Sequence, residues 1–245
     1  MEVRGSLAYY SEESSQPVVL PWLALQQLLD SALPIGGFSH SFGLETLVQE
    51  EVLQTSKQLE EYTVSMLMQS WSTADVMVIK SVYRDMPSFH YRSIWDVERL
   101  VHVQRAAIET RNGIEKMGRR LLQLLGSLYP DYDWTLLQEA LKSKSCLGTH
   151  PLVFGFACYR LGISLEQAAQ GYMYASIVNC INSALRLMSI GQTEGQTIIA
   201  RLTPKTLDAW KAVSGMTPED AFSFMPISEI AMMRHENLYS RLFMS

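Results

Sequence analysis

Histidine and cysteine side chains are the groups in this sequence best suited to bind a metal ion or to act as nucleophiles. The five histidines are widely separated: His40, His90, His102, His150 and His235. No two of them have the spacing that brings two metal ligands to one side of a helix. The three cysteines contain no C-x-x-C pair: Cys146, Cys158 and Cys180. Because this pattern is typical of neither a disulfide framework nor a zinc knuckle, we expect no metal site and three reduced, mostly buried thiols.

One pair of residues could support thiol catalysis. Cys146 and His150 are four residues apart and would form a reactive pair if one helical turn joined them. Gly148 and Pro151 disfavour such a turn, and no asparagine or aspartate is identifiable that would orient the histidine. An enzyme that uses Cys146 or Cys158 with a histidine is therefore the alternative to a protein without catalytic residues.

Other chemistry is excluded more simply. The sequence contains neither G-x-x-x-x-G-K-[ST] nor a strand that leads into G-x-G-x-x-G, so it has no phosphate-binding loop of either kind. The paired carboxylates lie at expected helix ends or polar faces, where solvation explains them: Glu50-Glu51, Glu60-Glu61, Asp131 with Asp133, and Glu219-Asp220. Twenty basic and 25 acidic residues give a net charge of −5, which argues against nucleic acid as a partner.

Three segments instead carry residue types that suit contact with another protein. The first, residues 33–45, reads LPIGGFSHSFGLE, and its adjacent glycines allow the backbone to approach another surface closely. The second, residues 190–196, reads IGQTEGQ, and we expect it at the end of a long helix with Gly191 as the C-cap. The third, residues 234–245, combines aromatic, aliphatic and arginine side chains as interface hot spots do. We expect this tail either to fold back onto the body of the protein or to dock into another subunit.

The pattern of apolar residues predicts helices along nearly the whole chain. Apolar residues recur with a period near 3.6, and convincing period-2 runs are almost absent. The clearest helix is expected over residues 164–191, where Ser164 and Gln167 form a capping box, and Thr55 and Gln58 form a second box. The sequence therefore predicts an all-α fold, a single-domain helical bundle of roughly ten helices.

Other helices can be placed approximately from caps and helix breakers. We expect them over residues 20–32, over residues 93–125, on both sides of Pro204, and from about residue 228 toward the C-terminus. Gly113 and Gly118 are possible breaks, because glycine disfavours a helix interior. Asp133 and Thr149 are expected N-caps.

Length and composition fit one folded domain. The chain has 245 residues, of which 47% are hydrophobic and only 18% charged, so it can bury a large core. We find no linker and expect a flexible segment over residues 1–20 and one domain over residues 21–245. No secretory signal is visible, and the longest apolar run is shorter than the roughly 18–20 residues that cross a bilayer. We therefore expect a cytoplasmic protein that contacts no membrane.

The three interface-like segments together resemble the urease accessory protein UreF family. The matching stretches are residues 33–45, residues 191–196, and Arg234-His235-Glu236 followed by residues 239–243. They occur in the family's order and span residues 33–245. One such motif is weak, whereas three in register are specific.

The resemblance implies a non-catalytic helical scaffold that forms a homodimer and assists urease maturation. Proteins of this family bind the accessory protein UreD, called UreH in some organisms, and then the GTPase UreG. The complex acts on apo-urease, whose active-site lysine is carbamylated and which receives two nickel ions in a GTP-dependent process. Nickel is thus handled by the complex, and this chain would bind no cofactor stably.

The resemblance also implies which residues bind partners. Five residues of the tail would engage UreD: Arg234, Tyr239, Arg241, Leu242 and Phe243. His235, Glu236 and Ser240 of the same segment would also bind partners. A second set would lie at or near the face used for the GTPase and the dimer: Gly36, Gly37, Phe38, Ser39, His40, Ser41, Arg186, Gln192, Thr193, Gly195 and Gln196. A third hypothesis, beside the scaffold and the thiol enzyme, is a carrier whose own histidines bind nickel.

Overall fold

The structure is a computed structural model, and it describes residues 19–245. Within this range the regular elements are helices and no strand occurs, which confirms the all-α prediction. The flexible segment predicted over residues 1–20 falls almost entirely on residues 1–18, outside the described range. No helix of the described range combines the length and apolar character needed to span a bilayer.

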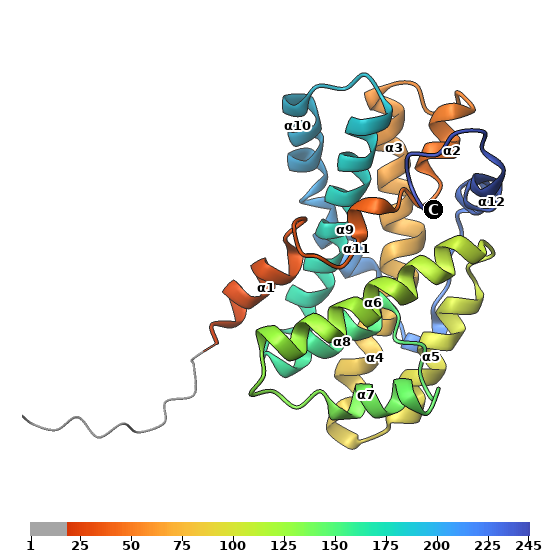
Figure 1. Ribbon diagram of the computed structural model, residues 1–245. Coiled ribbons are helices and arrows are strands. Elements are labelled where there is room, and N and C mark those ends of the chain that lie inside the picture. The colour runs from red at the N-terminus through yellow and green to blue at the C-terminus, as the bar shows by residue number, and fades with distance from the viewer. Residues whose placement is uncertain (1–18) are drawn as a thin grey trace, which may run out of the picture.

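The α-helices are labelled in Figure 1. They are α1 (Pro21–Leu29), α2 (Leu44–Gln49), α3 (Ser56–Met66), α4 (Val76–Asp85), α5 (Tyr91–Val103), α6 (Ile108–Leu128), α7 (Thr135–Lys142), α8 (His150–Arg160), α9 (Leu165–Leu187), α10 (Gln192–Leu202), α11 (Lys205–Val213) and α12 (Pro226–Arg234). A π-helical segment, Leu67–Asp75, joins α3 to α4. Short 3₁₀ turns occur at Gly37–Ser39, Met86–Ser88, Pro218–Asp220 and His235–Asn237.

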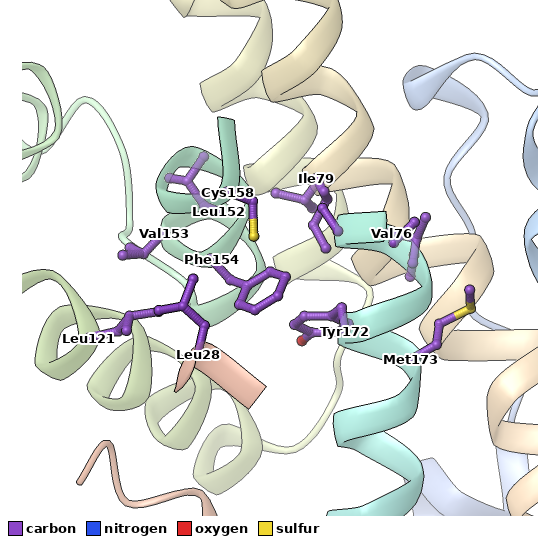
Figure 2. Close-up of a cluster of buried hydrophobic side chains, with 14 of the residues drawn as sticks. Leu28, Val76, Ile79, Leu121, Leu152, Val153, Phe154, Cys158, Tyr172 and Met173 are labelled. Atoms are coloured by element: carbon purple, nitrogen blue, oxygen red, sulfur yellow. The ribbon is translucent and has the colours of Figure 1, made fainter. Parts of the chain in front are cut away.

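The core forms around α8 and α9. Helix α9 runs through the middle of the molecule and packs against α1, α2, α3, α4, α8, α10 and α11 (Figure 1). Helix α8 is buried along Pro151–Cys158 and lies between α4 and α6. Figure 2 shows Phe154 of α8 pointing toward Tyr172 of α9, and their ring centroids are 5.5 Å apart. On its other side α8 approaches α4 closely at Gly155, where a Cβ would lie 3.1 Å from the Cα of Ile79.

Both predicted capping boxes are confirmed. The amide of Gln167 donates to the Ser164 hydroxyl at 3.3 Å, and the amide of Gln58 donates to the Thr55 hydroxyl at 3.2 Å. In each box the glutamine side chain accepts from the N-cap amide in return. Local sequence therefore determines where α3 and α9 begin.

The predicted breaks at Gly113 and Gly118 are wrong. Both glycines lie inside α6, and the chain between residues 93 and 125 instead divides at residues 104–107. Each glycine makes room for a neighbour: an added Cβ would lie 2.8 Å from Cε1 of His40 at position 113, and 2.1 Å from the oxygen of Gly148 at position 118. Tertiary packing thus explains both residues.

Several helix ends also differ from the prediction. Helix α1 ends at Leu29 and α9 ends at Leu187, both a few residues early, and Gly191 is the N-cap of α10, not a C-cap. The last helix ends at Arg234. A 3₁₀ turn, His235–Asn237, follows it, and the amides of residues 242–244 bind acceptors far away in the sequence, as described below.

The two predicted N-caps behave differently from each other. The N-cap of α7 is Trp134, one residue after the predicted Asp133. The Asp133 carboxylate nevertheless accepts from the amide of Thr135, the first residue of the helix, at 2.9 Å. Thr149 is the N-cap of α8, but its hydroxyl makes no capping bond. The buried Glu98 of α5 instead holds the chain just before α8, because its carboxylate accepts from the amides of Leu147 at 2.8 Å and Thr149 at 2.7 Å.

Candidate functional site

The candidate site begins with the glycine loop, residues 30–43, which connects α1 to α2. Gly36 has a left-handed conformation with φ of 88°, a conformation that glycine adopts at little energetic expense. Its carbonyl oxygen accepts from the hydroxyl of Ser39 at 2.6 Å, and this closes the 3₁₀ turn Gly37–Ser39. The turn leaves the Phe38 side chain 65% exposed.

The tail, residues 234–245, lies against this loop. The main-chain oxygen of Ser245 accepts from the amides of Ser41 at 2.6 Å and Phe42 at 3.0 Å, and the amide of Met244 donates to the carbonyl of Ser39 at 2.8 Å. The His40 ring is buried, with Nδ1 2.7 Å from the Ser245 hydroxyl. Figure 1 shows this end of the chain beside α2, so two of the three predicted segments meet in the fold.

Glu45, in the first turn of α2, is the main acceptor for the tail. Its side chain is almost fully buried, and it accepts from the amide of Leu242 at 2.6 Å through Oε1 and from the amide of Phe243 at 3.1 Å through Oε2. Nε2 of the buried His235 lies 3.0 Å from the same Oε2. One carboxylate therefore binds two consecutive amides and one imidazole of the tail.

A second carboxylate holds the other side of His235. Nδ1 of His235 lies 2.8 Å from Oε2 of Glu109 in α6, and Arg241 donates to Oε1 of Glu109 at 2.7 Å. Burial alone would raise the pKa of Glu109, but the hydrogen bonds from His235 and Arg241 outweigh it, so this pKa is lowered. The charged form of Glu109 is thus the form that the tail stabilises.

Arg186 of α9 joins the tail to the loop. Its guanidinium lies over the ring of Phe243, 4.3 Å from the centroid, and Nη1 donates to the carbonyl of Phe38 at 2.9 Å. A cation over an aromatic face contributes about 0.5–1 kcal/mol at exposed sites and more when desolvated. The tail thus folds back onto the body of the protein, which is one of the two outcomes expected from the sequence.

The fold-back leaves one side of the tail exposed. Tyr239 is fully exposed, Leu242 is 52% exposed and Met244 is 58% exposed, whereas Phe243 is 4% exposed. Glu236, Ser240 and Arg241 are also exposed. The outward side of the tail therefore combines apolar and aromatic side chains with the polar Glu236, Ser240 and Arg241, and it lies beside the exposed Phe38.

The second predicted segment lies elsewhere. Gln192, Thr193 and Gln196 are exposed in the first turn of α10. Gly195 faces α9, where a Cβ would lie 3.0 Å from Leu185. Among the described residues, no hydrogen bond or ion pair links this turn to the glycine loop or to the tail. Glu194 borders a separate groove of about 540 Å³ between this turn and the loop that precedes α3.

Sequence reasoning missed Glu45 and Glu109. Glu45 carried a signal, since it is a carboxylate between Leu44, Thr46 and Leu47, all of which are buried with it, and a buried carboxylate requires several hydrogen-bond donors. Glu109 lies in the first turn of α6, where a carboxylate is explained by the helix dipole, so it carried none.

The three thiols do not resemble nucleophiles. All are buried, and burial raises the pKa of Cys146 to about 12 and that of Cys180 to about 11. A thiol of this kind carries almost no thiolate near neutral pH. Within residues 19–245, no group of three or more histidine, cysteine, aspartate or glutamate side chains is placed to hold a metal ion.

Comparison with known proteins identifies the family of this chain. A model of the UreF family matches residues 53–203. The urease accessory protein UreF of Bacillus sp. (strain TB-90) is 33% identical over 227 residues, which cover 91% of this chain and 98% of that protein. The proteins of the same description from Haemophilus influenzae (strain 86-028NP) and Lachnoclostridium phytofermentans are 31% and 30% identical, and the matches cover 91% of this chain and 94% and 98% of the relatives. The chain therefore belongs to the UreF family of urease accessory proteins.

Proposed function

We propose that this chain is a non-catalytic scaffold in urease maturation. It acts in the cytoplasm as a homodimer that bridges UreD (UreH) and the GTPase UreG on apo-urease and assists GTP-dependent insertion of nickel. Nickel is the cargo of the complex, and this chain holds no stable cofactor. The observation that carries the proposal is the tail, which buried hydrogen bonds hold in place while Tyr239, Leu242 and Met244 remain exposed.

The surface beside the tail supports UreD docking at this end of the molecule. Ile227, Ile230 and Met233 of α12 are 64%, 54% and 49% exposed and are spaced three residues apart along one side of the helix. Together with the outward residues of the tail, they give an apolar surface of the kind that marks protein interfaces. We assign this surface to UreD.

The glycine loop supports contact with the GTPase or with a second copy. Phe38 is exposed at the tip of a turn that Arg186 and the tail hold rigid. A rigid aromatic side chain loses little conformational entropy on binding, and such residues are common hot spots. Gln192, Thr193 and Gln196 would belong to a separate contact, because they lie in α10.

Deletion of residues 239–245 tests the assignment to UreD. We expect the truncated chain to lose UreD in a pull-down while its far-UV circular dichroism stays helical. Tyr239→Ala should weaken binding at least tenfold, because truncation of a central aromatic anchor removes about 2 kcal/mol or more. Phe89→Ala is the matched control, since Phe89 is a 73% exposed aromatic on the loop before α5. UreD binding by the truncated chain at full strength would contradict the assignment.

A cellular experiment tests the role in maturation. A urease operon is expressed with this coding sequence deleted and then restored, and urease activity and the nickel content of purified urease are measured. We expect both to fall on deletion, with apo-urease still assembled, and both to return on restoration. Normal activity without the chain would overturn the proposal.

Equilibrium dialysis with nickel separates the scaffold from a carrier. We expect the isolated chain to show no tight nickel site. One tight site for each chain would assign the histidines as ligands and contradict the scaffold hypothesis.

A further inference from the structure

The way in which Glu45 binds the tail is unusual. Neighbouring amides of an extended chain point in opposite directions, yet the amides of Leu242 and Phe243 both donate to this one carboxylate, at 2.6 and 3.1 Å. The next amide, of Met244, donates to the carbonyl of Ser39. The backbone of the tail is thus held at three consecutive residues.

This backbone arrangement determines which side chains face outward. Phe243 and Ser245 are 4% and 2% exposed, while Leu242 and Met244, which alternate with them, are 52% and 58% exposed. The chain bends at Leu242 and Phe243, so that both amides reach Glu45 while one side chain faces outward and the other inward. The inward ring of Phe243 lies against Arg186, whose guanidinium is 4.3 Å from its centroid.

We propose that Glu45 is a positioning residue that holds the bend of the tail at Leu242 and Phe243 and so orients the side chains shown to UreD. The inference rests on the proposed function, because the outward side chains matter to UreD only if the tail binds it. Glu45 itself is buried and touches no partner.

The surroundings of Glu45 suit this role. His235 lies between Glu45 and Glu109, 3.0 and 2.8 Å from their oxygens, so the carboxylate of Glu45 is held in one orientation. Its remaining protein donor is Gln49, whose Nε2 lies 3.3 Å from Oε1. A conformation of the tail that kept this carboxylate buried without its two backbone donors would be strongly destabilised.

The first variant is Glu45→Gln, made in the full chain. The amide group of glutamine has nearly the same shape, but its NH₂ would face a backbone N–H and could not accept a hydrogen bond. We expect amide hydrogen exchange at Leu242 and Phe243, measured by NMR, to become at least tenfold faster, and affinity for UreD to fall at least tenfold. Glu60→Gln is the matched control, because Glu60 pairs with Arg201 on the surface of α3 and α10 and contacts no tail residue. It should change neither quantity.

The second variant tests the outward side chains separately from the backbone contacts with Glu45. In the double substitution Leu242→Phe with Phe243→Leu, the backbone donors to Glu45 are kept while the inward and outward side chains are exchanged. We expect protected amides at both positions together with weakened UreD binding. Since this variant leaves Glu45 intact, it tests whether the outward side chains matter to UreD even if Glu45→Gln fails to fold.

The outcomes separate this inference from the proposed function. If deletion of residues 239–245 leaves UreD binding unchanged, the assignment of the tail to UreD fails. If the deletion abolishes binding while Glu45→Gln binds as the unmodified chain does, Glu45 does not set the outward face and the inference is overturned, whatever happens to amide exchange. Full UreD binding by the exchanged Leu242/Phe243 variant would overturn it as well.

Discussion

Buried carboxylates hold together parts of this protein that are far apart in the sequence. Glu45 accepts from the tail, and Glu98 accepts from the two amides that precede α8. Burial raises the pKa of Glu98 even though these amides favour its charged form. Each carboxylate replaces water with backbone donors, which is how a buried charge is tolerated.

Two glycines of α6 allow a prediction about single residues, because alanine should have opposite effects on stability at the two positions. Gly113→Ala should destabilise the protein by about 1–3 kcal/mol, because the new Cβ would lie 2.8 Å from the buried ring of His40. Gly126→Ala should stabilise it by about 0.5–1 kcal/mol, since nothing lies within 4 Å and alanine favours a helix. Urea denaturation measures both. Equal effects of the two substitutions would contradict the packing of His40 against α6.

Thiol reactivity gives a second prediction. We expect none of the three cysteines to react quickly with a disulfide reagent such as DTNB at pH 7–8, and all three to react in guanidinium chloride. The reason is burial, which raises the pKa of Cys146 to about 12 and that of Cys180 to about 11. A rapid reaction of one thiol in the native protein would revive the thiol-enzyme hypothesis.

The residue-level prediction from sequence succeeded where composition alone was sufficient. The apolar tail had to be covered or to remain a binding surface, and the structure covers Phe243 and exposes Leu242. The acceptors that hold the tail were not predictable, because Glu45 and Glu109 come together only through the packing of α2, α6 and α12.

The π-helical segment has the clearest structural role among the elements. The carbonyls of Gln69 and Thr73 in this segment accept from the amides of Phe224 at 2.8 Å and Phe222 at 3.0 Å. The residues that lead into α12 are therefore hydrogen-bonded to the π-helical segment between α3 and α4. This attachment places α12 beside α2, where Glu45 can reach the tail.

A prediction at the scale of elements concerns the end of α11. Nζ of Lys80 in α4 donates to the carbonyls of Val213 at 3.3 Å, Ser214 at 2.6 Å and Met216. Burial lowers the pKa of Lys80, and the nearby Arg84 lowers it further. Because Lys80 caps the negative end of the helix dipole, Lys80→Met should lower the free energy of unfolding by about 1–3 kcal/mol.

The control for this prediction is Lys211→Met, which changes an exposed lysine in the last turn of the same helix. We expect it to change stability by less than about 0.5 kcal/mol. Urea denaturation of the two variants compares them directly, and equal losses would show that Lys80 does not act as a cap.

Helix starts were more predictable than helix ends. The capping boxes at Thr55 and Ser164 depend only on residues three apart, so the sequence was sufficient to place them. The end of α12 depends on acceptors in α2 and α6, and the interior position of Gly118 depends on the backbone at Gly148. Such ends are decided by tertiary contacts, which periodicity does not contain.

Across the whole molecule, buried histidines determine the response to acid. Burial lowers the pKa of His40, His102 and His150 to about 4, whereas the unfolded chain titrates near 6.5. Below pH 6.5 the unfolded chain therefore binds protons that the folded protein does not. Stability is fully present above about pH 6.5 and is lost as pH falls toward 4, by up to roughly 3 kcal/mol for His150 and by less for His40 and His102.

Melting temperatures between pH 7 and pH 4.5 test this prediction. We expect a steep fall in the unmodified protein and a shallower fall in His102→Gln, because one of the three sites is removed. His90→Gln should follow the unmodified protein, since His90 is exposed. If the melting temperature of His102→Gln fell with pH as steeply as that of the unmodified protein, the lowered pKa of His102 would be contradicted.

The all-α class and the family were accessible from the sequence, whereas the arrangement of the three motif segments was not. The glycine loop and the tail meet in the fold, and Arg186 joins them. The first turn of α10 stays apart because Gly195 packs it against α9. Order along the chain gave no information on which segments would share a surface.

The contact between the glycine loop and the tail has a consequence for how the protein is made. Its hydrogen bonds join residues 204 positions apart, and at about 5–20 residues per second a ribosome needs roughly 10–40 s to synthesise the intervening chain. During that interval the loop has left the ribosome without the segment that completes it, and the carboxylate of Glu45 is open to solvent. A partner that recognises the joined surface would thus select chains whose synthesis has passed the tail and ignore nascent ones.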